Sequence, residues 1–126
     1  MWFKMRKLMN IPYEDIDPKC KDMVKLFNNV GLITEFSCQG HDNTYSNSFQ
    51  IMFSDFVNDR DINNFLSNFD EHPTHTPIIG CFKKWARKHQ GSIKSNWEYI
   101  VNYGDYKLNQ EFALEDYKIM KKFFEE

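Results

Sequence analysis

The chain has 126 residues, a length that suits one domain with its own core and predicts a single domain over 1–126. Aromatic side chains make up 17% of the residues. This apolar load is enough for a packed core and excludes a chain that is disordered throughout. The formal net charge of −2 excludes attraction to nucleic acid or to an anionic membrane by a global field, so any such surface must be a local patch.

The compartment follows from the cysteines and from the first residues. The chain has three cysteines, and Lys4, Arg6 and Lys7 interrupt the apolar positions near its start, which is not the pattern of a secretory signal. No run approaches the roughly 18 apolar residues of a membrane span. We therefore expect a cytoplasmic protein with reduced thiols and no membrane contact. The oligomeric state does not follow from the sequence.

The first predicted element is a helix over 18–30. Asp17 is a favourable N-cap, Pro18 suits the first helical position, and Gly31 is placed to end the helix in the left-handed conformation. Apolar residues recur inside this range at helical spacing. The pattern predicts one buried face on this helix.

Two strands and a second helix follow. The ranges 32–36 and 49–53 read as strands, joined by a polar loop over 37–48, and we expect them to pair antiparallel. A helix is predicted over 59–69. The two helices need a partner surface, so their apolar faces are predicted to pack on the sheet that contains these strands. The residues of those faces are Met23, Phe27, Val30, Phe65, Leu66 and Phe69.

The last third of the chain predicts a hairpin and a final helix. The ranges 78–88 and 96–103 read as strands around a turn at Gly91, although the aromatic spacing over 82–89 also fits a helix. A helix over 113–124 would bury Ala113, Tyr117, Met120 and Phe124. The resulting order, α-β-β-α-β-β-α, predicts an α+β fold with helices on one face of a mainly antiparallel sheet.

The most unusual string lies where the first strand ends. Ser37, Cys38, Gln39, Gly40 and His41 form a turn whose backbone N–H groups and side chains are candidates for binding a phosphate or a carboxylate. Cys38 and His41 are also candidates for a nucleophile and its base. The alternative is a tight turn in which Cys38 fills space and His41 is bonded locally.

This segment resembles a group of small, uncharacterised proteins, many of them phage-encoded. The resemblance rests on a helix, a strand with the pattern Gly-x-x-Thr, and a Cys-x-Gly-His turn, and the strand and turn lie within Gly31 to His41. It covers about Ile16 to Asp42. It implies a phage protein and brings no activity with it.

A zinc site is an alternative role for the same turn. Cys38 and His41 form one pair of potential ligands, and His72 and His75 form a second pair at the same spacing. Together they offer one sulfur and three nitrogens, a set that suits tetrahedral zinc. Pro73 within the second pair weakens this hypothesis. No cofactor is predicted otherwise.

The second candidate site is the basic, aromatic hairpin over 82–103. Cations and ring faces together suit a phosphate backbone with stacked bases, and they also suit an acidic protein. The alternative is a solvated hairpin whose rings point into the core. The acidic residues Asp55, Asp59 and Asp61 fit a solvated helix start better than a cation site. The candidate ligand-binding residues of the hairpin are Lys83, Lys84, Trp85, Arg87, Lys88 and Trp97.

Three hypotheses for the function remain. The first is a phage accessory or counter-defence protein that binds a host protein, nucleic acid or nucleotide through the Ser37–His41 turn and the hairpin. The second is a small enzyme that uses Cys38 and His41 on a phosphorylated or nucleotide substrate. The third is a zinc-stabilised structural domain. The chain lacks the phosphate-binding loop, the dinucleotide-binding glycines and the common metalloprotease motif, and this favours a binding protein over an enzyme.

Overall fold

The computed structural model describes residues 16–42, 46–69 and 78–125. The order α-β-β-α-β-β-α predicted from the sequence is confirmed for these residues. The strand predicted over 78–88 is also confirmed, although it begins at Cys81 and runs to His89, and this excludes the helical alternative over 82–89. The elements are α2 (Lys21–Asn29), β1 (Thr34–Cys38), β2 (Phe49–Phe53), α3 (Asp59–Ser67), β3 (Cys81–His89), β4 (Ser92–Val101) and α4 (Tyr106–Glu125).

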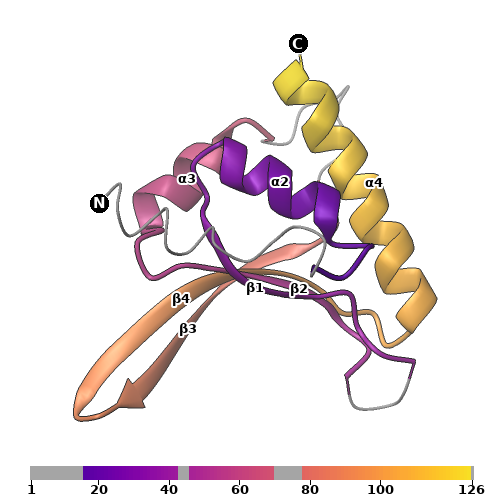
Figure 1. The fold of residues 1–126 in the computed structure, drawn as a ribbon. Coiled ribbons are helices and arrows are strands. Elements are labelled where there is room, and N and C mark those ends of the chain that lie inside the picture. The colour runs from indigo at the N-terminus through magenta and orange to yellow at the C-terminus, as the bar shows by residue number, and fades with distance from the viewer. Residues whose placement is uncertain (1–15, 43–45, 70–77, 126) are drawn as a thin grey trace.

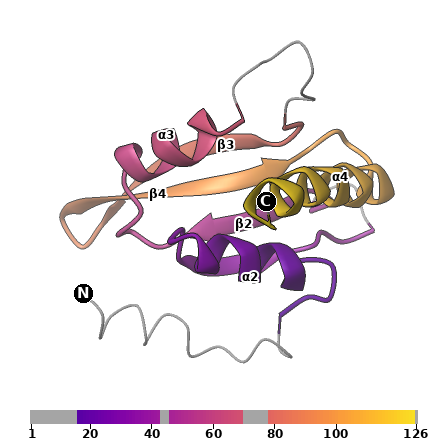
Figure 2. The same cartoon turned by 90° about the horizontal axis from the view of Figure 1, so that it is seen from above.

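The strands form one four-stranded sheet in the order β1-β2-β4-β3, and every neighbouring pair is antiparallel. The predicted pairing of the first two strands is therefore confirmed, although β1 begins at Thr34 and runs to Cys38. Helices α2, α3 and α4 all lie on one face of the sheet (Figures 1 and 2). The α+β architecture with helices on one face is what the sequence predicted. None of the described helices covers the other face, which we call the open face.

Aromatic rings fill the space between the helices and the sheet. Phe27 of α2 lies 5.0 Å from Phe53, 5.7 Å from Phe65 and 5.8 Å from Tyr99, measured between ring centroids. Edge-on and tilted ring pairs of this kind add to the stabilisation from burial. The predicted helix faces do meet the sheet. Met23, Phe27 and Phe65 are buried there, and Val30, Leu66 and Phe69 pack partly buried against them.

The start of α2 differs from its prediction. The helix begins at Lys21, after a turn over residues 18–20, and its N-cap is Cys20, which makes no side-chain capping bond. The predicted cap, Asp17, instead accepts a hydrogen bond from the backbone N–H of Gln39 at 3.0 Å. The Asp17 carboxylate is therefore engaged in a tertiary hydrogen bond and does not cap the helix. Gly31, with φ of +91°, follows the helix end in the left-handed region as predicted.

The final helix is longer than predicted, and its buried face is rotated. It begins at Tyr106 because Asp105 caps it, accepting from the backbone N–H of Leu108 at 2.8 Å. Ala113 and Met120 are buried as expected, whereas Tyr117 is only partly buried and Phe124 is 38% exposed. Two polar residues complete the buried face, which consists of Asn109, Ala113, Asp116 and Met120.

Asp116 explains this rotation because it bonds three groups of the sheet. Its carboxylate accepts from the backbone N–H groups of Ile79 and Gly80 and from the Tyr99 hydroxyl, each at 2.7 Å. A buried carboxylate with three donors is satisfied, so this polar position anchors the helix over the start of β3. Burial nevertheless raises the pKa of Asp116, while these hydrogen bonds act in the opposite direction.

The β3–β4 hairpin turns through two residues, Gln90 and Gly91, which have φ of +50° and +81°. Positive φ at both positions is the geometry of the tight turns that match the twist of paired strands. The hairpin is longer than predicted on its second strand, since β4 begins at Ser92. Within the described residues, no helix is long and apolar enough to cross a membrane.

Candidate functional site

The β3–β4 hairpin reaches well beyond the body of the protein. Figure 1 shows its turn projecting away from all three helices and from β1 and β2. Every residue of β3 from Lys83 to His89 is exposed. We call residues 83–97 the arm. Beyond the residues that adjoin α3, most of the arm is exposed, and its exposed side chains are available to a partner.

The strand register divides the side chains of the arm between two faces. Phe82 and Tyr99 are paired and pack on the helix side. Side chains alternate along a strand, so Lys84 and Trp97, the next helix-side pair, share that side. The open face then carries Lys83, Trp85, Arg87 and Lys94. The predicted hairpin residues therefore do not form one surface.

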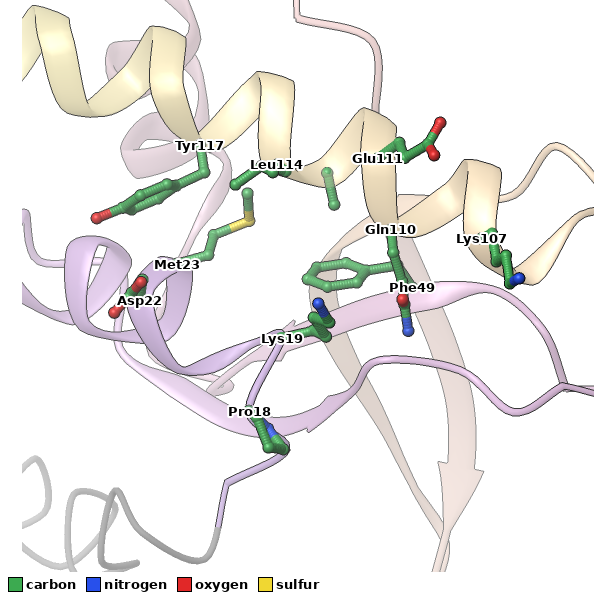
Figure 3. Close-up of a pocket in the computed structure, with 11 residues that line it drawn as sticks. Pro18, Lys19, Asp22, Met23, Phe49, Lys107, Gln110, Glu111, Leu114 and Tyr117 are labelled. Atoms are coloured by element: carbon green, nitrogen blue, oxygen red, sulfur yellow. The ribbon is translucent and has the colours of Figure 1, made fainter.

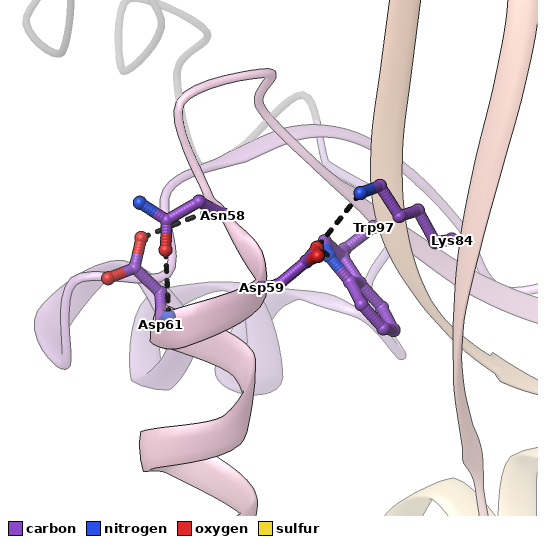
Figure 4. A network of polar contacts seen from close by, with 5 residues as sticks. All are labelled: Asn58, Asp59, Asp61, Lys84 and Trp97. Atoms are coloured by element: carbon purple, nitrogen blue, oxygen red, sulfur yellow. Dashed lines mark hydrogen bonds and ion pairs between the residues drawn. The ribbon is translucent and has the colours of Figure 1, made fainter.

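On the helix side, Asp59 at the start of α3 holds two of the predicted binding residues. Its carboxylate accepts from Lys84 Nζ at 3.0 Å and from Trp97 Nε1 at 2.8 Å (Figure 4). The hydrogen bond from Lys84, and then that from Trp97, lowers the pKa of Asp59. Lys84 and Trp97 thus hold the end of the arm that is farthest from its turn against α3.

The neighbouring acid, Asp61, has a structural role. Asn58 accepts from the backbone N–H of Asp61 at 2.9 Å, and the Asp61 carboxylate accepts from the backbone N–H of Asn58 at 3.1 Å (Figure 4). This reciprocal pair is a capping box. It agrees with the sequence interpretation of Asp61 as part of a helix start.

On the open face, a ring lies among cations. The Trp85 side chain is 50% exposed, and Lys83 and Arg87 lie two residues before and after it on the same strand. Lys94 is paired with Arg87 across the hairpin. Like charges placed opposite each other destabilise a strand pair, so this arrangement is not explained by the stability of the hairpin.

One acidic residue lies beside this ring, and sequence reasoning missed it. Glu98 is paired with Lys83 on the open face and is only 3% exposed. Among the described residues, its Oε1 atom has no hydrogen-bond partner. Burial raises the pKa of Glu98, while a hydrogen bond from Trp85 and the charge of Lys83 act in the opposite direction. Side chains alternate between the two faces of the sheet along residues 96–101, and this alternation could have placed Glu98 on the open face.

The Ser37–His41 turn lies at another edge of the sheet and is tied to its surroundings. The backbone N–H of Gly40 lies 3.4 Å from Cys38 Sγ, and that of His41 donates to Ser46 O at 2.7 Å. The N–H of Gln39 is already bonded to Asp17. These three N–H groups therefore have acceptors within the protein, and an anion at this turn would need side-chain donors.

The turn does bring its two reactive side chains together. Cys38 Sγ lies 3.8 Å from His41 Nε2. Cys38 is half-buried and His41 is exposed. The nearby Cys20 differs from both because burial raises the pKa of its thiol to about 12, which leaves it protonated at neutral pH.

The turn and the arm are separate sites. Cys38 lies in one row across the sheet with Gln50, Ile100 and Cys81. The hairpin turn lies eight residues farther along β3, roughly 26 Å at the rise of a strand. A ligand that contacts Cys38 and the tip of the arm at once would have to span this length.

The four-residue zinc set is only partly described. Cys38 and His41 adjoin each other, whereas His72 and His75 lie outside the described residues. Within the described ranges, no group of three or more His, Cys, Asp or Glu residues is arranged to hold a metal ion.

A groove of about 330 Å³ runs between the start of α2 and α4 (Figure 3). Two residues of its lining are bonded to Gln39 of the turn: the Gln39 side chain accepts from the backbone N–H of Lys19, and the Gln39 carbonyl accepts from Gln110 Nε2. Lys19 and Lys107 line the groove, as do Asp22 and Glu111. Because the cations and anions are equal in number, the groove favours neither a positive nor a negative ligand. Neither Cys38 nor His41 lines the groove.

Comparison with known proteins connects the chain to a family. The model of the family described as YoqC prophage protein matches residues 5–125. No curated protein matches the chain. No solved structure matches it either.

Proposed function

Starting from the fact that the chain belongs to the YoqC prophage protein family, we propose that it is a phage accessory protein that binds nucleic acid through the open face of its arm. It acts in the cytoplasm of the host cell. The observation that carries this proposal is the placement of Trp85 among Lys83, Arg87 and Lys94 on a projecting face. The family description supports the phage origin, and the arm supports the ligand.

The arm favours nucleic acid over an acidic protein for a physical reason. Phosphates are neutralised by Lys and Arg, and bases stack on exposed rings, so a ligand with both groups uses all of this face. An acidic peptide would use the cations and leave the half-exposed indole in water. The net charge of −2 confines attraction to this patch, because the rest of the molecule repels a polyanion.

Fluorescence anisotropy with a labelled single-stranded oligonucleotide tests the proposal. We expect the triple variant Lys83→Ala/Arg87→Ala/Lys94→Ala to bind much more weakly than the unmodified protein. Three neutralised phosphates on a single strand also predict a slope of log affinity against log salt of about −2, which the variant should lose.

A matched control removes the same charge elsewhere. Lys118, Lys121 and Lys122 are exposed on α4, and their triple alanine variant should bind like the unmodified protein. Equal weakening by both triples would show that net charge alone matters and would overturn the proposal. If no oligonucleotide binds and an acidic host protein is captured without competition from nucleic acid, the ligand class is wrong.

A second candidate function uses the Cys38–His41 contact of 3.8 Å. In this hypothesis His41 takes the thiol proton, and the Cys38 thiolate attacks the phosphorus of a phosphorylated or nucleotide substrate. The P–O bond to the leaving group breaks, and the departing oxygen takes the proton from His41. Iodoacetamide labelling, resolved by peptide mass spectrometry, tests it. Cys38 should react faster than the exposed Cys81, and His41→Ala should slow Cys38 alone. Equal rates for Cys38 and Cys81 would remove the enzymatic hypothesis.

A zinc-stabilised domain is the third candidate. Its test is metal analysis of protein purified without chelator, where one zinc per chain that is lost in His75→Ala would support it. Protein that is free of zinc and still folded at neutral pH would eliminate a structural ion.

A further inference from the structure

The open face holds one group that phosphate binding does not use. Glu98 is 3% exposed, and its Oε1 has no hydrogen-bond partner among the described residues. An acceptor left unpaired in a buried position costs about 1–3 kcal/mol. A carboxylate in that state, on a face with no described helix over it, needs an explanation.

The neighbours of Glu98 indicate what would pair with it. In the sheet register, Met52 and Lys83 lie on either side of Glu98, and Phe36 lies beyond Met52 in the same row. Phe36 is 53% exposed and Trp85 is 50% exposed. The buried carboxylate therefore lies between two half-exposed rings. A ligand would have to displace side chains of the open face to reach this carboxylate.

We propose that the Glu98 carboxylate accepts a hydrogen bond from the amino group of an unpaired base that stacks on Trp85, so that the ligand is a single strand and its bases are distinguished. This inference rests on the proposed function and adds the strandedness and base preference of the ligand. Phe36 offers the stacking surface for another base of the same strand.

The chemistry of the bases decides the preference. Adenine, guanine and cytosine carry exocyclic amino groups that donate to a carboxylate. Thymine has no amino group, and its ring N–H lies between two carbonyl oxygens that a carboxylate repels. In a duplex, these groups are engaged by the opposite strand. Glu98 therefore favours an unpaired base with an amino group, which guanine and cytosine represent in the test, over thymine.

The test uses a twelve-nucleotide oligothymidylate and versions with one central guanine or cytosine. We expect the substituted strands to bind the unmodified protein about 10-fold more tightly, the effect of one well-placed polar base contact. In Glu98→Gln the difference should shrink below about 2-fold, because an amide is a weaker, uncharged acceptor. The matched control Glu111→Gln removes an exposed carboxylate from α4 and should keep the preference.

The outcomes separate this inference from the proposed function. If the plain oligothymidylate binds and the guanine or cytosine adds nothing, the base contact is wrong and phosphate binding stands. If the preference persists in Glu98→Gln, another residue makes the contact and the inference falls. If no strand binds at all, the proposed function fails and the inference fails with it.

Discussion

The arm and the Ser37–His41 turn belong to the same sheet but are built in opposite ways. In the turn, the backbone N–H groups of Gln39 and His41 are bonded to residues around it, and that of Gly40 is bonded to Cys38 within it. The arm is exposed along β3 and carries like charges face to face at Arg87 and Lys94. The Ser37–His41 turn, which has the more unusual sequence, is therefore held by hydrogen bonds within the protein. The basic arm, whose sequence is less unusual, is exposed to a partner.

The largest expected effect is a difference in stability between two glycine variants, one in the turn and one in the arm. Gly40 has φ of +94°, and a Cβ there would lie 2.6 Å from the backbone oxygen of Asn47. We expect Gly40→Ala to lower the free energy of unfolding by about 2–4 kcal/mol, through backbone strain and this clash. Urea denaturation followed by circular dichroism measures it.

The control is Gly91→Ala at the tip of the arm. Its φ of +81° is also unfavourable for alanine, but no atom lies within 4 Å of its added Cβ. The loss should be about 1 kcal/mol. Equal losses at the two glycines would contradict the picture of a packed turn and a free arm.

The next effect concerns the contact that holds the turn to the segment before α2. Asp17→Ala removes the acceptor for the N–H of Gln39, and we expect it to lower the free energy of unfolding by about 1–2 kcal/mol. Asp42→Ala, at an exposed position just after the turn, should change it by less than about 0.5 kcal/mol. A thermal melt of both variants decides whether the Asp17 contact matters.

A third prediction concerns pH and the open face. The pKa of Glu98 is raised by burial, so its folded pKa lies above its unfolded one. Ionisation then destabilises the folded state as pH rises above the unfolded pKa, and the loss levels off above the folded pKa. Removing this ionisation in Glu98→Gln should therefore raise the free energy of unfolding by about 1 kcal/mol at neutral pH.

The gain from Glu98→Gln should shrink as pH falls below the unfolded pKa of a glutamate, about 4.3, because Glu98 is then protonated in both states. Lys83 faces Glu98 from β3, and Glu35 of β1 reaches the same face through its contact with Asn96 at 3.3 Å. Glu35→Gln is the control for the pH profile. A gain from Glu98→Gln that does not vary with pH would mean that ionisation is not its source.

The smallest expected effect lies in the arm itself. Arg87→Ala removes one of two facing cations and should leave the free energy of unfolding unchanged or raise it by up to about 0.5 kcal/mol. Oligonucleotide affinity should fall in the same variant. A loss of stability above 1 kcal/mol would show that Arg87 supports the fold.

Sequence patterns predicted the order of elements because each apolar stripe needs a surface to cover it. They failed where a polar group is satisfied at a distance. Asp17 was assigned to a local cap, yet it bonds Gln39. Asp116 was overlooked within the last helix because periodicity counts apolar residues, and its three donors come from residues 17 to 37 positions earlier.

The candidate sites were only partly predictable for the same reason. The basic character of the hairpin was visible, but which cations share a face depends on register, and Lys84 and Trp97 turn out to bond Asp59. The closeness of Cys38 and His41 follows from their spacing in a turn. Alternation along 96–101 could have placed Glu98 on a face, but its burial and its pairing with Lys83 follow only from the fold.

The position of β3 at the edge of the sheet has a consequence for the behaviour of the protein at high concentration. An edge strand offers free backbone groups that can pair with the same strand of another molecule. In β3, two such copies would bring together the positive charges of Lys83, Lys84, Arg87 and Lys88, and this repulsion keeps the molecules apart. Neutralising these residues therefore also removes a safeguard against aggregation, and light scattering should show larger particles for such variants than for the unmodified protein at low salt, where the repulsion is not screened.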